Sequence, residues 1–223
     1  MCTTAKYSLI AVILAVVIAV ILWYRNWTID RLVAVVVIGL GTLQLLSYAC
    51  HSSLNSSTTG ALVAFIIWFL LLAFSFTIYV YTRSKLAMGL TLISILFLIY
   101  VIYGIFSGSH RYLAYTYPGR SIPTWASLNA AGEESGIMGS LLWPYLGLFL
   151  VGWLCMAGYQ GWTDITMYVL LAFIIITVLC VPVSFHGHQF GSYWTYLLIG
   201  LGLITLLIGS FCPPTISPPA KLG

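Results

Sequence analysis

Residues 60–82 read GALVAFIIWFLLLAFSFTIYVYT, a long apolar run without a single Asp, Glu, Lys or Arg. The hydrocarbon core of a bilayer is about 30 Å thick, and an α-helix needs about 20 mostly apolar residues to cross it. Strands of membrane β-barrels instead alternate apolar and polar residues over about ten positions. The length and the continuity of this run therefore predict a transmembrane helix.

Six further stretches have the same apolar character: Ser8–Tyr24, Leu32–Cys50, Leu86–Phe106, Gly139–Tyr159, Ile165–Phe185 and Ser192–Phe211. Of the 223 residues, 61% are hydrophobic and 5% are charged, and the mean hydropathy is +1.07. A soluble domain carries about 25% charged residues, so this composition excludes an ordinary soluble enzyme, a nucleic-acid-binding protein and a disordered chain. We expect an all-α fold, with one domain of seven transmembrane helices over residues 1–211 and a Pro-rich tail over residues 212–223.

The first apolar stretch follows Lys6 and so has one feature of a signal peptide. The stretch is longer than a typical signal-peptide core, and Trp23-Tyr24-Arg25 is not a small-residue cleavage site. We therefore expect a retained first helix.

The basic residues between the helices indicate an orientation, because short cytoplasmic loops carry an excess of Lys and Arg. Five of them fall on one side of the predicted bundle: Arg25, Arg31, Arg83, Lys85 and Lys221. Lys6, Arg111 and Arg120 fall on the other side. We expect the N-terminus outside and the C-terminal tail in the cytosol. This topology also makes Asn55, in the sequon Asn55-Ser56-Ser57, a candidate for glycosylation.

The long outer loop over residues 107–138 is rich in Tyr and Trp, which suit a membrane interface. Pro123 is a favoured first residue of a helix, and Gly132 a favoured stop. We expect a short helix from Pro123 to Ala131 that rests on the outer surface as a lid or re-entrant segment. An ordered loop is the alternative. Pro144 and Pro182 are expected to kink the fifth and sixth helices.

No Asp, Glu, Lys, Arg or His lies in the middle of a predicted helix. Such residues mark proton relays, ion-coupled transport and cofactor counter-ions in membrane proteins. The sequence also lacks an HExxH motif and a lysine in the last helix that could hold retinal. We therefore predict no catalytic residue, no cofactor and no enzymatic activity.

A polar seam is predicted on the second and third helices, with Gln44, Ser47, Tyr48, Ser75 and Tyr79 at helical spacing. A Gln side chain in hydrocarbon needs partners, so Gln44 is expected to face the bundle interior. The seam serves either as hydrogen-bonding contacts between helices or as the lining of a narrow pore. Four glycines are expected to permit close helix approach, namely Gly39, Gly41, Gly202 and Gly209.

All four histidines are expected on the outer side, where two acidic residues also lie. The group consists of His51, His110, His186, His188, Glu133 and Glu134. A His-x-His pair with another His or Glu could bind Zn²⁺ or Cu²⁺, and imidazoles titrate near pH 6.5, which suits a pH sensor. Histidines of loops are more often solvated. Cys2 and Cys50 could form a disulfide on the same side.

The segment Arg31–Cys50 is similar to the second helix of a family of multi-pass membrane proteins of giant (nucleocytoplasmic large) DNA viruses. That family often carries Gln-Leu-Ile-Glu-Tyr where this chain has Gln44-Leu45-Leu46-Ser47-Tyr48. Phe190-Gly191-Ser192-Tyr193-Trp194 resembles the start of the family's last helix. Ser47 replaces the acidic residue of the family pattern. The resemblance implies a viral multi-pass protein of a virion or host-cell membrane and supplies no activity.

These observations lead to one function and one alternative. The first is a non-enzymatic membrane protein that organises or stabilises a membrane, with the lipid bilayer, copies of itself or other membrane proteins as partners and with no nucleic acid. The alternative is a passive channel or transporter for a small solute or ion, lined by the polar seam.

Overall fold

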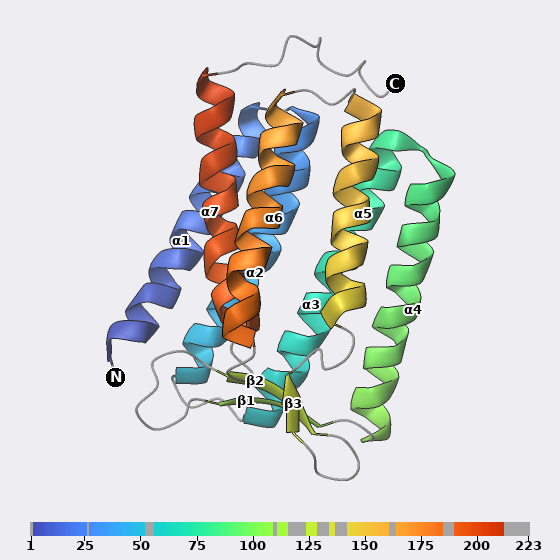
Figure 1. Cartoon of the computed structure of the whole chain (residues 1–223). Helices are drawn as coiled ribbons and strands as arrows, with labels where there is room; N and C mark the ends of the chain where they lie inside the picture. Colours follow the sequence, from blue (N-terminus) through green and yellow to red (C-terminus); the bar gives the residue numbers. More distant parts are fainter. Residues whose placement is uncertain are drawn as a thin grey trace.

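The computed structural model describes residues 2–25, 27–51, 56–108, 111–115, 124–128, 134–136, 142–160, 164–184 and 190–211. These residues form seven helices and a small sheet (Figure 1). The helices are α1 (Cys2–Arg25), α2 (Thr28–His51), α3 (Ser56–Thr82), α4 (Lys85–Ser107), α5 (Leu142–Gln160), α6 (Asp164–Ser184) and α7 (Phe190–Phe211). Each coincides with one predicted apolar stretch, so the helical bundle is confirmed.

The helices run alternately in opposite directions, and α1 begins and α7 ends at opposite ends of the bundle (Figure 1). We call the end where α1 stops and α2 begins the charged end, because Arg25, Asp30, Arg31, Arg83 and Lys85 lie there. The opposite end is the sheet end. Among the described residues, four helices contain spans long and apolar enough to cross a membrane: Lys6–Arg25, Ile29–Leu46, Ser57–Thr82 and Lys85–Ser107.

Helix α3 occupies the middle of the bundle and packs against α2, α4 and α5, while α1, α2 and α7 pack against one another. The connection from α3 to α4 is short and hydrogen-bonded. The Ser84 side chain accepts a hydrogen bond from the Ala87 N–H at 3.1 Å and so caps α4. Arg83 takes a left-handed backbone conformation (φ 51°) that turns the chain between the two helices.

The four predicted glycine contacts are confirmed. A Cβ at Gly41 would lie 2.9 Å from that of Ala15, and one at Gly202 would lie 2.7 Å from Ile18. A Cβ at Gly39 would overlap Leu70, and one at Gly209 would overlap the Arg25 guanidinium. The small size of glycine therefore lets α1, α2, α3 and α7 approach one another closely at these positions.

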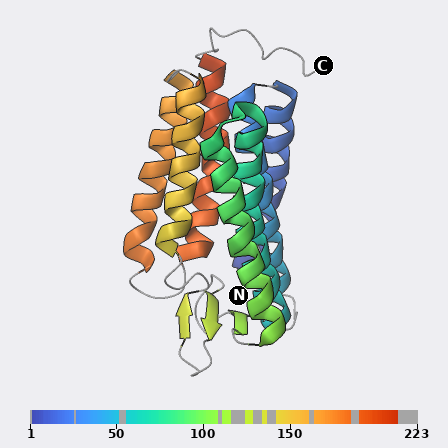
Figure 2. The ribbon, with the colours of Figure 1, turned by 90° about the vertical axis from the view of Figure 1, so that its right-hand side faces the viewer.

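A three-stranded antiparallel sheet lies beneath the helices at the sheet end, as Figure 2 shows. Its strands are β1 (Arg111–Tyr115), β2 (Thr124–Leu128) and β3 (Glu134–Gly136), and Leu113 pairs with Ala126. The helix predicted from Pro123 to Ala131 is therefore wrong for residues 124–128. Aromatic and β-branched residues favour a pleated surface that is partly covered, and here β1 pairs with β2 and packs against the first turns of α3.

The kinks predicted at Pro144 and Pro182 do not interrupt a helix interior. Helix α5 begins at Leu142, so Pro144 lies in its first turn, where a missing N–H costs no intrahelical hydrogen bond. Pro182 lies in the last turn of α6. The first proline therefore suits the start of a helix, and the second lies near a helix end.

Candidate functional site: the charged end of the bundle

Arg25 and Asp30 form a two-pronged ion pair across the α1–α2 connection. Arg25 Nε donates to Asp30 Oδ2 at 2.5 Å, and Arg25 Nη2 donates to Asp30 Oδ1 at 2.6 Å. The Asp30 side chain is fully buried and that of Arg25 is 18% exposed. Arg25 ends α1 and Asp30 lies in the first turn of α2, so each charge also suits the dipole of its own helix.

The same guanidinium ties the first two helices to the last one. Arg25 Nη2 donates to the carbonyl of Thr205 at 3.0 Å, and Nη1 donates to the carbonyl of Leu206 at 3.1 Å. The Trp27 ring covers the guanidinium, with 4.2 Å between Arg25 Cζ and the ring centroid. We call Arg25, Asp30 and the two α7 carbonyls the clamp. It joins α1, α2 and α7 in one hydrogen-bonded unit.

Arg31 lies one residue beyond the clamp and contacts two other helices. Its Nη1 donates to the hydroxyl of Tyr81 on α3 at 3.1 Å. Its Cζ lies 5.5 Å from the centroid of the Trp23 ring on α1. Arg83, which follows α3, lies with its Cζ 5.8 Å from the centroid of Tyr79. The charged end therefore combines cationic and aromatic side chains, as in proteins that contact lipid headgroups.

The structure separates the predicted polar seam into two parts. Gln44 is fully buried, as expected, and Tyr48 is half-buried. At about 1.5 Å per residue, Gln44 lies roughly 24 Å from the start of α2, whereas Ser75 lies roughly 10 Å from the end of α3 at the same end of the bundle. The two side chains are therefore at different depths. The side chain of Ser47 lies outside the described residues.

Ser75 has its partners on α3 itself and on α4. Its hydroxyl donates to the carbonyl of Leu72 at 3.1 Å and lies 3.2 Å from that of Ser94 on α4. Ser94 in turn donates to the carbonyl of Leu90 at 2.8 Å. Tyr79 packs at the edge of the core with Arg83 over its ring. Ser75 therefore connects α3 to α4, and the two roles predicted for the seam stay predictions.

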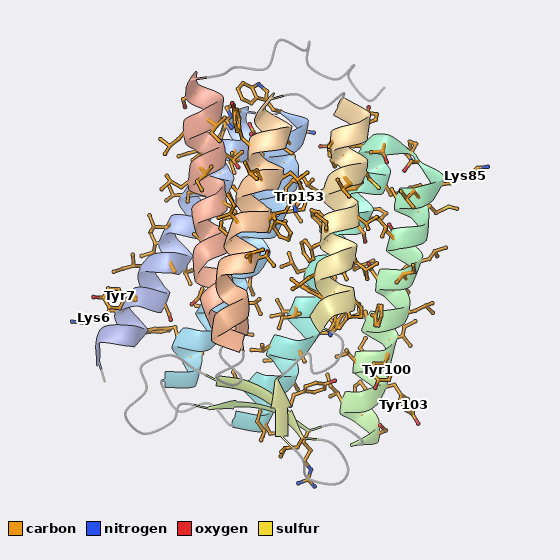
Figure 3. All side chains as sticks on the ribbon, viewed as in Figure 1. Lys6, Tyr7, Lys85, Tyr100, Tyr103 and Trp153 are labelled. Carbon is orange, nitrogen blue, oxygen red and sulfur yellow. The ribbon has the colours of Figure 1, made fainter. Side chains whose placement is uncertain are left out.

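Aromatic rings fill the interior between α3, α4, α5 and α6. Ring centroids lie 4.5 Å apart for Phe74 and Phe149, 5.3 Å for Phe74 and Trp153, and 5.2 Å for Trp68 and Tyr145. The Tyr145 hydroxyl donates to the carbonyl of Ile67 at 3.0 Å. Figure 3 shows Trp153 within the bundle, between the outer helices. Stacked and edge-on rings of this kind hold neighbouring helices in a fixed register.

Several predicted site residues lie outside what the structure describes. They are Asn55, His110, Glu133, His186 and His188, together with the side chains of Cys2, Cys50, His51 and Glu134. Among the described residues, no three His, Cys, Asp or Glu side chains gather as a metal site would require. The predicted outer metal or pH-sensing group and the predicted disulfide therefore stay predictions.

Tyr112 anchors the sheet to the bundle and should respond to pH. It is 7% exposed, and burial, with a smaller contribution from the charge of Tyr100, raises its pKa from 10.0 to about 12. The Tyr112 phenol therefore stays neutral to a higher pH in the folded protein than in the unfolded chain. The stabilisation is complete below pH 10.0 and is lost as the pH rises towards about 12.

We expect Tyr112→Phe to remove the part of the alkaline loss of stability that comes from this residue, because Phe cannot ionise. Thermal unfolding of detergent-solubilised protein, compared on either side of the Tyr112 transition, measures the effect. Tyr103→Phe is the matched control, because the Tyr103 ring is exposed on α4 (Figure 3). Equal alkaline losses in wild type and Tyr112→Phe would contradict the assignment.

Sequence reasoning identified Arg25 and Arg31 only as markers of orientation and overlooked Asp30. One signal was present. Asp30 is one of four acidic residues in the chain, and it stands between two arginines beside an apolar run. An acidic residue at such a position needs a cationic partner if the helix begins there.

No protein-family model matches the chain, and no curated protein is detectably similar to it in sequence.

Proposed function

We propose that the chain is a non-enzymatic multi-pass membrane protein whose rigid bundle organises or stabilises a membrane. The observation that best supports this role is how the interior is filled. Trp153, Tyr145, Phe74 and Phe149 are fully buried and in mutual contact at the centre of the bundle. An interior packed with rings resists deformation and excludes water.

The proposal includes seven membrane-crossing helices. Helices α5, α6 and α7 have 19, 21 and 22 residues. At about 1.5 Å per residue they are about 28 to 33 Å long, which matches a hydrocarbon core of about 30 Å. The outward faces of α1 and α4 are apolar along their length, which suits contact with lipid tails. The four helices with long apolar spans already indicate a membrane protein.

The proposed orientation has the charged end in the cytosol. Arg25, Arg31, Arg83 and Lys85 lie at that end, while Lys6 and Arg111 belong to the sheet end. The resemblance of the second and last helices to giant-virus proteins supports a virion or host-cell membrane as the location.

A channel or transporter for a small solute is the second candidate. It is favoured by Gln44, an amide buried within α2, and by Trp153, whose Nε1 is buried with no hydrogen-bond acceptor among the described residues. A solute with a hydrogen-bonding group would interact with such side chains. The contacts of Ser75 and Ser94 favour the first role, because these hydroxyls bond to each other and to their own helices.

Flux of ions and small neutral solutes into sealed proteoliposomes separates the two functions. We expect flux no greater than in empty vesicles at about pH 5.5 and about pH 7.5, on either side of histidine titration. Flux above background would overturn the structural role. In that event Gln44→Leu should abolish it, whereas Thr42→Val should not, because Thr42 is exposed on α2 and bonds to the Ile38 carbonyl.

A further inference from the structure

Arg31 has hydrogen-bonding capacity that the described part of the protein does not use. A guanidinium carries five N–H donors. One Nη1 bond to the Tyr81 hydroxyl is present, and the buried Nε has no acceptor among the described residues. Nη2 also makes no hydrogen bond among the described residues and, unlike Nε, it is not buried, so Nη2 is the group that an acceptor outside the protein can reach.

The charge of Arg31 is also uncompensated within the described residues. Asp30 is its neighbour in sequence, but both carboxylate oxygens of Asp30 accept hydrogen bonds from Arg25. The ion pair between Arg25 and Asp30 is the one salt bridge that the described side chains form. Arg83 and Lys85 add further positive charge to this end. The missing acceptor should therefore be an anion.

The surroundings of Arg31 place it where a membrane lipid would present its headgroup. The Trp23 ring beside it is 55% exposed, and Tyr24, the next residue of α1, is 86% exposed. Trp and Tyr gather at the level of the headgroups, with their rings towards the acyl chains. Val20, about one turn before Trp23 on the same face of α1, is also exposed. The side of the bundle next to Arg31 thus presents apolar side chains at the depth of the hydrocarbon core and cationic side chains at the level of the lipid headgroups.

We propose that Arg31, with Trp23 and Tyr81, binds the phosphate group of an anionic phospholipid in the leaflet that faces the charged end. This inference rests on the proposed membrane-embedded function. The planar guanidinium donates paired N–H groups to phosphate oxygens, a geometry that an ammonium group cannot reproduce. The Trp23 ring lies over the same guanidinium, and the Tyr81 hydroxyl holds it in place between α1 and α3.

Native mass spectrometry of the full chain in detergent, titrated with phosphatidylglycerol or phosphatidylcholine, tests the site. We expect wild type to prefer phosphatidylglycerol, and Arg31→Gln to weaken its binding by about tenfold or more, as loss of a charge-assisted hydrogen bond implies. Arg31→Lys keeps the charge and should retain part of the affinity. Retention of full affinity by Arg31→Gln would overturn the proposal.

Lys85→Gln is the matched control, since it removes one positive charge from the same end. Figure 3 shows Lys85 pointing away from the bundle at the start of α4. One basic residue near an anionic surface contributes about 1 kcal/mol, so we expect at most about a fivefold loss. Equal losses of phosphatidylglycerol affinity in the two variants would mean that only net charge matters, and would overturn the specific site at Arg31. Circular dichroism and gel filtration establish that each variant is folded.

Competition with inorganic phosphate shows whether the site binds the phosphate group of a lipid or a free phosphate ion. We expect phosphate to leave phosphatidylglycerol bound, because the apolar part of the site contacts the lipid as well. If phosphate displaces the lipid from wild type, the site binds the free ion and the lipid assignment is overturned. Lipid binding in detergent and solute flux in vesicles are independent measurements, so failure of one is distinguishable from failure of the other.

Discussion

Asp30→Ala is expected to lower the free energy of unfolding by about 3–5 kcal/mol, the usual cost of removing one partner of a buried ion pair. The substitution leaves the Arg25 guanidinium, which is 18% exposed, with the carbonyls of Thr205 and Leu206 and the Trp27 ring but no negative charge. The three helices joined by the clamp should separate more readily. Unfolding in mixed micelles of increasing denaturing detergent, followed by circular dichroism, measures the loss.

Two further variants show whether the loss comes from the unpaired charge. Arg25→Met combined with Asp30→Leu should recover much of the stability, because apolar residues often replace a buried ion pair without cost. Lys85→Gln removes an exposed charge at the same end and should change stability by no more than about 0.5 kcal/mol. If Asp30→Ala unfolds with wild-type stability, the clamp does not hold the helices together.

Gly60→Ala is expected to detach the sheet from α3 and to cost about 1–3 kcal/mol, as overpacking of a close contact usually does. A Cβ at Gly60 would overlap the backbone of Tyr112 and Leu113 in β1. Backbone atoms in a paired strand cannot rotate aside as the end of a side chain can. Either β1 or the first turn of α3 must therefore move, and Tyr112 would lose its buried position.

Limited trypsin digestion detects this movement, because Arg111 begins β1 and its backbone becomes accessible when the strand detaches. We expect faster cleavage at Arg111 in Gly60→Ala than in wild type. The matched control is Gly89→Ala in α4, where a Cβ would meet nothing within 4 Å. That variant should be neutral or more stable by up to about 1 kcal/mol. Equal cleavage rates in Gly60→Ala and wild type would contradict the close contact.

The helices were predictable because each apolar run is continuous and about as long as the hydrocarbon core is thick, so a single helix explains it without tertiary information. The sheet was not. Pro123 and Gly132 gave local signals for a helix, while the strand β2 depends on pairing with β1 and on the proximity of α3. The sequence of neither strand indicates which segment it will pair with. Local rules therefore failed where non-local contacts decide the conformation.

The clamp illustrates the same limit for the site. Arg25 and Asp30 are five residues apart, and their pairing depends on where α1 ends and α2 begins. The carbonyl that Arg25 reaches on Thr205 is 180 residues away in sequence. No charged residue or motif in the sequence of α7 indicates this contact. In contrast, the burial of Gln44 was predictable, since a polar side chain in an apolar run has few alternatives to the interior.

The tight turn between α3 and α4 has a consequence for how the chain is made. Only Arg83 and Ser84 separate the two helices, and the Ser84 cap ends the turn at once. A connection this short lets neither helix enter the bilayer far ahead of the other. During synthesis, α3 and α4 should therefore insert together as a helical hairpin. Its buried Ser75–Ser94 contact would form at that stage and give the later helices α5 and α6 a preassembled surface on which to dock.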